Sequence, residues 1–123
     1  MRAFRRAVET NDLPALKALL APEVIFHSPA SFKPFRGAEL VGFVLETVST
    51  VFEDFGYTSE FQDGRRSGLV FRARIGDKQV EGIDLIETDE QGLITALTVM
   101  VRPLSGVLAL AEAMGARLGK DPR

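Results

Sequence analysis

The stretch 82-GIDLIETDEQGLITALTVMVRP-103 decides the fold. Apolar residues alternate on both sides of "TDEQG", a connection of hairpin length, and so predict antiparallel strands over 79–88 and 93–102. Two earlier segments, 57–63 and 67–76, have the same period of two and are joined by "DGRRSG". The second half of the chain is therefore predicted to form a mostly antiparallel meander.

Helical patterns precede and follow this sheet. Apolar residues recur at three- and four-residue steps over 2–21, with an interruption at "TNDLPA", and a wide apolar stripe follows over 38–55. Gly56 is predicted to end this long helix, and a last helical pattern covers 104–118. The order predicts one α+β domain over 1–123, in which a curved sheet wraps around the helices as a cone with an internal cavity.

Composition excludes several classes of protein. Fifteen basic and seventeen acidic residues give a net charge of −2, so we expect neither nucleic acid nor an anionic membrane as a partner. There is no cysteine, and the single histidine and scattered carboxylates have no ligand spacing, so we expect no metal or other cofactor. No run approaches the about 20 apolar residues of a membrane span, and we expect a cytoplasmic protein.

The aspartate at position 84 is the anomaly of the predicted sheet, because it lies among β-branched and apolar residues in "EGIDLIE". Burial of a carboxyl group is costly unless the group is paired or protonated. A desolvated aspartic acid would have a raised pKa and could donate a hydrogen bond to a ligand oxygen. The alternative is a structural role, in which Asp84 pairs with a nearby arginine or caps a backbone group.

The only histidine, His27, ends the short strand "EVIFH" and precedes a proline-stiffened loop. Strict alternation turns Phe26 and Ser28 inward and His27 outward, unless Pro29 twists the end of the strand. Turned inward, His27 would be the one side chain suited to proton transfer near pH 7, and Asp84 could be its partner. Turned outward, it would be a structural residue hydrogen-bonded to the loop.

Both faces of the predicted sheet are substantially apolar, whereas a sheet with one solvated face should alternate cleanly. The helices can cover one face. The opposite face needs another cover, and a second copy of the chain is the simplest one, so we expect a homodimer.

The order of these elements and three motifs resemble the nuclear transport factor 2-like superfamily, in its SnoaL-like or ketosteroid-isomerase-like branch. The motifs are "ND.PAL..LLAPEVIFHSP", "PFRG" at the start of the long helix, and the stretch 82–103. The resemblance covers about residues 1–103. It implies the fold more than a reaction, because this fold hosts isomerases, cyclases, dehydratases, hydrolases and binding modules.

The steroid isomerases of this branch use a tyrosine on the first helix, an aspartic acid on a central strand, and an aspartate before a proline after the first strand. The resemblance puts Phe4, Asp84 and Ser28 at these three positions. A serine hydroxyl cannot abstract a carbon-bound proton without a base of its own. The resemblance therefore does not imply that mechanism for this chain.

The same overlay implies a cavity wall and a dimer face. The expected catalytic residues are Asp84 and His27, and the expected ligand-binding residues are Phe4, Phe26, Ser28, Phe35, Phe71, Ala73, Val80, Gly82, Leu97, Val99 and Val101. The convex face, where the family makes its dimers, would hold Arg72, Arg74, Glu81, Ile83, Leu85, Met100 and Arg102.

Three functions fit these expectations. The first is an enzyme of isomerase, cyclase or dehydratase type, in which a protonated Asp84 polarises the carbonyl group of an apolar ligand and His27 moves a proton. The second is a binding module with the same cavity and ligand class but no chemistry. The third is a structural dimer whose cavity is filled by its own side chains.

Overall fold

Two short helices open the chain, which the computed structural model describes over residues 1–118. They are α1 (Arg2–Glu9) and α2 (Leu13–Ala18). Asp12 caps α2, because its carboxylate accepts a hydrogen bond of 3.1 Å from the Ala15 N–H, and a proline follows in the first turn. The predicted interruption between the two helices is confirmed, and the last five residues of the predicted domain lie outside the described part.

A short edge pair and the main helix come next. Strand β1 (Leu20–His27) pairs antiparallel with β2 (Phe35–Arg36), and helix α3 (Ala38–Val48) follows directly. Strand β1 begins earlier than the "EVIFH" segment predicted from the sequence. The two-residue strand β2 lies within the segment expected to be a loop.

Helix α3 also ends earlier than the sequence pattern predicts. The N–H groups of Thr50 and Val51 donate to carbonyls three residues back, so the chain turns tightly and strand β3 begins at Glu53. The predicted end at Gly56 is wrong. The apolar pattern runs past the helix because Phe52 and Phe55, on the turn and the strand, are also partly buried and pack with Val48 of α3 against a second apolar cluster.

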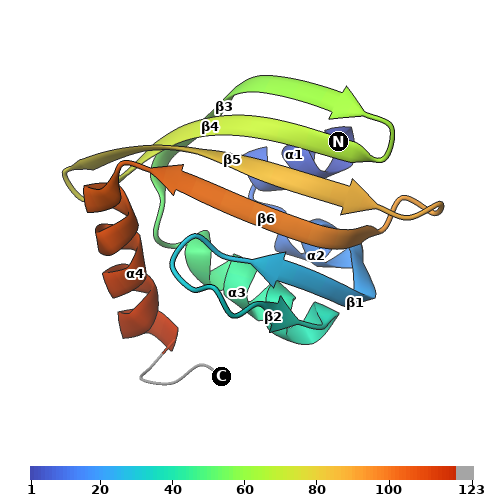
Figure 1. Cartoon of the computed structure of the whole chain (residues 1–123), viewed down its shortest axis with the longest axis horizontal. Helices are drawn as coiled ribbons and strands as arrows, with labels where there is room; N and C mark the ends of the chain where they lie inside the picture. The colour runs from blue at the N-terminus through green and yellow to red at the C-terminus, as the bar shows by residue number, and fades with distance from the viewer. Residues whose placement is uncertain (119–123) are drawn as a thin grey trace.

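The predicted meander is confirmed in its order. Its strands are β3 (Glu53–Asp63), β4 (Arg66–Ile75), β5 (Lys78–Thr88) and β6 (Ile94–Arg102), each antiparallel to the next. Strand β1 joins this meander by pairing parallel to β6, which gives the order β2-β1-β6-β5-β4-β3. The six-stranded sheet is curved and open, so the fold is the expected α+β cone (Figure 1).

Helices α1, α2 and α3 cover the concave face of the sheet, and helix α4 (Leu104–Leu118) lies across one end of the strands (Figure 1). A main core lies between α1–α3 and the sheet and includes Val24, Val41, Leu69 and Ile86. A second cluster lies under α4, where Leu110 packs with apolar residues of β4 and β5. Helix α4 therefore closes one end of the cone.

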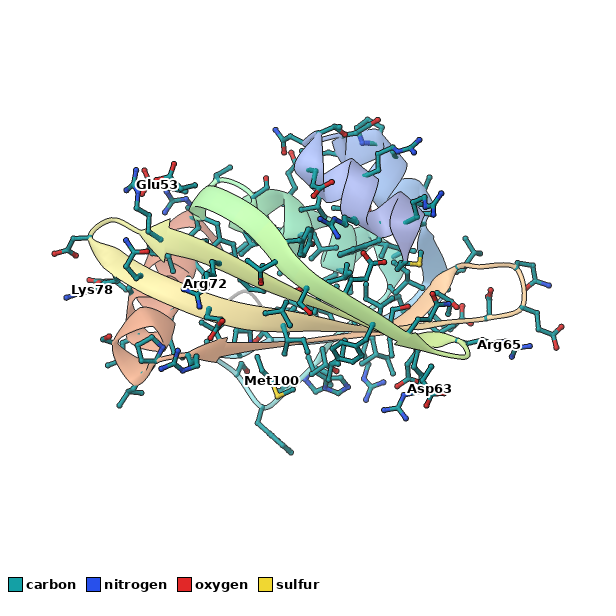
Figure 2. All side chains as sticks on the ribbon, turned by 90° about the horizontal axis from the view of Figure 1, so that it is seen from above. Glu53, Asp63, Arg65, Arg72, Lys78 and Met100 are labelled. Atoms are coloured by element: carbon teal, nitrogen blue, oxygen red, sulfur yellow. The ribbon has the colours of Figure 1, made fainter. Side chains whose placement is uncertain are left out.

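The convex face carries no helix in the described part of the chain, and the Met100 side chain points away from the helices (Figure 2). Met100 is 50% exposed, while Ile83 and Leu85 beside it are half-buried. Glu81 lies 3.3 Å from the guanidinium nitrogens of both Arg72 and Arg102. This face thus has an apolar centre with charged pairs at one end.

The length and hydropathy of a helix decide whether it could cross a membrane. Within residues 1–118, no helix is both long enough and apolar enough to cross a lipid bilayer.

Candidate functional site

A cavity of about 300 Å³ lies between the concave face of the sheet and the helices, and α4 also contributes to its wall. Aliphatic side chains from α1, α2, α3, β6 and α4 form much of this wall. Polar groups are few. They come from Glu9, Asn11, Ser49, Tyr57 and Asp84. An open cavity of this size conflicts with the structural alternative, in which the chain's own side chains would fill the space.

Aromatic rings form one side of the cavity. The Phe55 and Phe71 rings stack with centroids 4.9 Å apart, and Tyr57 meets Phe55 edge to face at 5.0 Å. Phe52 contacts Phe71 at 5.5 Å. Such clusters are stabilised beyond simple area burial, so this wall is held in a fixed arrangement.

Gly82 explains how the Phe71 ring reaches its place. The two residues are directly paired across β4 and β5, and a Cβ atom at position 82 would collide with the Phe71 ring. Only glycine lets the ring lie against the strand. Gly82 therefore leaves the space that the Phe71 ring of the aromatic wall occupies, and it does not itself line the cavity.

Asp84 is the polar centre of the site. It lies on the inward face of β5, two residues beyond Gly82, and is 7% exposed. The Tyr57 hydroxyl donates a hydrogen bond of 2.9 Å to its Oδ2. None of the ion pairs formed within residues 1–118 involves Asp84, so the structural alternative of pairing with an arginine is wrong.

The second carboxyl oxygen of Asp84 is available to a ligand. Within residues 1–118, Oδ1 makes no hydrogen bond, and no fully buried side-chain oxygen or nitrogen is left without a partner. Because Asp84 lines the cavity, Oδ1 must be accessible from it. The carboxyl group is thus held by Tyr57 at one oxygen and exposed to the cavity at the other.

Burial controls the ionisation of this pair. Desolvation raises the pKa of Asp84 from 3.8 to about 7, while the hydrogen bond from Tyr57 acts in the opposite direction. The pKa of Tyr57 is raised well above its usual range, first by burial and then by the neighbouring Asp84 charge. Tyr57 therefore stays protonated, whereas Asp84 changes its charge near neutral pH.

A charged group on α1 lies next to Tyr57. The Arg5 guanidinium carbon is 5.6 Å from the Tyr57 ring centroid, close enough for a cation–π contact. Arg5 also forms ion pairs of 2.9 Å with Glu9 on its own helix and with Glu60 on β3. These contacts link α1 to β3 beside the cavity.

Several residues expected at the cavity wall do lie there, and their role in binding a ligand stays a prediction. They are Phe4, Phe26, Phe71, Leu97 and Val99, together with Asp84.

Other expected residues lie elsewhere. Ala73, Val80 and Val101 belong to the cluster under α4, because the strands there pass beyond the cavity. Phe35 stacks on Phe26, with ring centroids 6.1 Å apart, and belongs to the core and not to the cavity wall. Ser28 is half-buried and is absent from the cavity wall.

His27 requires the clearest correction. It is exposed and pairs with Thr98 across β1 and β6, and Thr98 in turn pairs with Leu85 on the convex face. Alternation holds to the end of β1, because Phe26 stays inward, paired with Leu97, and Pro29 does not reverse it. His27 and Asp84 therefore lie on opposite faces of the sheet and cannot form a catalytic pair.

Tyr57, Phe52 and Phe55 also line the cavity, and none of them was predicted as a site residue. Tyr57 is the only tyrosine of the chain, and its cross-strand partner is Phe71, itself paired with Gly82. A comparison of strand registers could have put the phenol on the same face as Asp84. The spacing of Phe52 and Phe55 continues the apolar pattern of α3, which predicts helical core residues and not cavity residues.

No group of three or more histidine, cysteine, aspartate or glutamate side chains in residues 1–118 is arranged to hold a metal ion.

Comparisons with known proteins agree with this fold. The family model described as a SnoaL-like domain matches residues 1–97. A steroid delta-isomerase from Pseudomonas aeruginosa is 45% identical, with a TM-score of 0.90, over 94% of this chain and 85% of that one. A protein with a cystatin-like fold from Silicibacter pomeroyi is 35% identical, with a TM-score of 0.92, over 99% and 86% of the two chains.

More distant structures show the fold alone. An NTF2-like protein of unknown function from Mesorhizobium loti is 21% identical, with a TM-score of 0.73, over 84% of this chain and 88% of that one. No curated protein matches the chain. The family model covers most of the sequence, and the chain belongs to the SnoaL-like family of the nuclear transport factor 2-like superfamily.

Proposed function

We propose that the cavity binds an apolar small molecule and that an oxygen atom of this ligand accepts a hydrogen bond from the protonated Asp84 carboxyl group. The observation that carries the proposal is the accessible Oδ1 of a buried carboxyl inside an apolar cavity of about 300 Å³. This volume is at the lower end of ligand pockets, which favours a compact ligand. Apolar contacts would supply affinity, and the carboxyl group would fix the ligand's orientation.

Similarity to the Pseudomonas aeruginosa protein supports an apolar ligand. That protein is called a steroid delta-isomerase, and steroids are apolar ring systems. The similarity does not supply a mechanism, since Ser28 occupies the expected position of the base.

A second candidate function is proton transfer on the bound ligand. The observation in its favour is the pKa of Asp84, about 7, because general acid–base catalysis works best when the pKa of the group is near the operating pH. Asp84 would then act without His27. Its carboxylate would remove a proton from the carbon beside a ligand carbonyl and later return one to carbon.

Carbon-13 NMR of the Asp84 carboxyl group tests the binding proposal. We expect 2-indanone, a compact apolar ketone, to raise the pKa of Asp84 above about 7, because the ketone binds only the protonated form. Asp77→Asn is the matched control, since Asp77 lies at a hairpin tip with a 90% exposed side chain. An Asp84 resonance that titrates identically with and without saturating ketone would exclude the proposal.

Deuterium exchange separates binding from catalysis. In D₂O, a proton-transfer enzyme should introduce deuterium beside the carbonyl of 2-indanone faster than buffer alone. Asp84→Asn should remove the excess rate and Asp77→Asn should keep it. Binding without any excess rate would leave the binding module as the function.

We also propose that the convex face forms a homodimer interface. Ile83, Leu85 and Met100 would supply its apolar centre. The Arg72–Glu81–Arg102 group lies at one end of this face, where it can exchange ion pairs with a two-fold related copy.

A further inference from the structure

The charges that line the cavity are of one sign. The charged residues at its wall are Glu9 and Asp84, both acidic, and no lysine, arginine or histidine among residues 1–118 lines it. Glu9 is already paired with Arg5. Arg5 itself contacts the Tyr57 ring and not the Asp84 carboxyl group. When Asp84 ionises, its charge therefore has no cationic partner inside the cavity.

The rest of the wall is suited to a cation as well. The aromatic residues that line the cavity are Phe4, Phe26, Phe52, Phe55, Tyr57 and Phe71. The faces of aromatic rings carry partial negative charge and attract ammonium groups, most strongly where water is excluded. The cavity thus combines a carboxylate with electron-rich rings, the two kinds of group that recognise organic amines.

Tyr57 prepares the carboxylate for such a ligand. Its hydroxyl occupies Oδ2 and, as a donor, favours the ionised form of Asp84. Oδ1 then remains as an acceptor facing the cavity. An ammonium group is a donor only, so it satisfies Oδ1 without competing with Tyr57.

We propose that the cavity also binds a small protonated amine with an apolar body, whose ammonium group pairs with Oδ1 of the Asp84 carboxylate and contacts the aromatic wall. This inference rests on the cavity being a ligand site, the first part of the proposed function. It adds a second ligand class. Ligands of this class would bind the ionised form of Asp84, whereas an oxygen-bearing ligand would bind its protonated form.

The two ligand classes must respond to pH in opposite directions. The titratable residues that line the cavity are Asp84 on β5, Tyr57 on β3 and Glu9 on α1, with Arg5 of α1 next to Tyr57. Within residues 1–118, the other elements contribute only non-titratable side chains to the wall. Asp84, with a pKa of about 7, is therefore the group expected to change the affinity near neutral pH.

A matched pair of probes tests this expectation. 2-Aminoindane and 2-indanone share one carbon skeleton, and the amine stays protonated between pH 6 and 8. Titration calorimetry should show amine affinity rising by about tenfold from pH 6 to pH 8, because the competent carboxylate fraction rises by that factor. Ketone affinity should fall by about tenfold over the same interval.

Variants test whether the charge of Asp84 is responsible. Asp84→Asn should weaken amine binding at pH 8 by at least tenfold and retain ketone binding, because the amide N–H group can still donate. Asp77→Asn should bind both probes as the unaltered protein does. Circular dichroism checks the fold of each variant, and the pH series on the unaltered protein needs no variant.

The outcomes separate this inference from the proposed function. Ketone binding without amine binding would overturn the inference alone, as would an amine affinity that is unchanged by pH or by Asp84→Asn. Failure of both probes to bind would overturn the inference and the proposed function together. Amine binding without ketone binding would support the inference and remove the oxygen-bearing ligand from the proposed function.

Discussion

The Tyr57 hydroxyl donates its hydrogen bond to Oδ2 of Asp84 at 2.9 Å across the concave face, from β3 over β4 to β5. The two side chains are 27 positions apart in sequence. Because of this contact, the pKa of Asp84 depends on Tyr57. The stability of the protein and the ligand preference of the site depend in turn on that pKa.

Loss of the phenol should raise the pKa of Asp84. In Tyr57→Phe, the carboxylate loses the donor that stabilises its charge, while burial remains, so we expect the pKa to move upward from about 7 by roughly one unit. Carbon-13 NMR titration measures the change. Thr58→Ala, at an exposed neighbouring position, should leave the value where it was; an unchanged or lower value in Tyr57→Phe would contradict the assigned role.

Stability should depend on pH through Asp84. Because its pKa is raised from 3.8 to about 7 on folding, the stabilising contribution is fully present below pH 4 and is lost as the pH rises through 7. The loss amounts to about 4 kcal/mol at most, on the scale of 1.4 kcal/mol per pKa unit. Urea unfolding between pH 4 and 8 measures it.

Two variants test whether Asp84 causes this loss of stability. Asp84→Asn should not show this decline, whereas Asp77→Asn should follow the unaltered protein throughout. If the difference in unfolding free energy between the unaltered protein and Asp84→Asn is constant with pH, Asp84 does not titrate with a raised pKa.

Adding a methyl group at position 82 should disturb the aromatic wall. In Gly82→Ala the new Cβ collides with the Phe71 ring and with the backbone oxygen of Met100, so we expect a loss of about 1–3 kcal/mol in unfolding free energy, as for other overpacked cores. Gly56→Ala is the control, because nothing lies within 4 Å of a Cβ at that position. Equal stability of the two variants in urea would show that the wall tolerates displacement of Phe71.

The interface proposed on the convex face predicts that the protein dimerises in a concentration-dependent way. Met100→Glu puts a charge at the apolar centre and should weaken self-association at least tenfold in analytical ultracentrifugation. Phe43→Glu on α3 is the control, because Phe43 is similarly exposed, at 51% against 50% for Met100. A monomer at all concentrations, or an equal effect of both substitutions, would rule out this interface.

Much of the fold could be predicted because period and connection length are local properties of the sequence. The meander and the hairpins followed from alternation together with the short connections between the strands. The end of α3 could not be predicted in this way, because Phe52 and Phe55 keep helical spacing while the backbone has already turned. The turn depends on hydrogen bonds that the apolar pattern does not encode.

The part of the site that could be predicted was the residue whose chemistry differs from that of its neighbours in sequence. Asp84 stood out because a carboxyl group in an apolar strand needs a physical reason. Its partner did not stand out, because a tyrosine in a strand is ordinary and the β3–β4 register shifts on either side of Tyr57. His27 was predicted as a catalytic residue because its imidazole suits proton transfer near pH 7. Strict alternation along the strand, which predicts that His27 faces outward, agrees with the structure.

The sheet order has a consequence for how the chain is made. Among the strands of residues 1–118, β6 follows the other five in sequence, yet it lies between β1 and β5 and connects the two halves of the sheet. Until it leaves the ribosome, the early strands and the β3–β5 hairpins have no common edge, and Asp84 lacks its cross-strand neighbour Val99. Closure of the sheet and desolvation of its buried acid should therefore coincide in one step, when β6 joins the two halves.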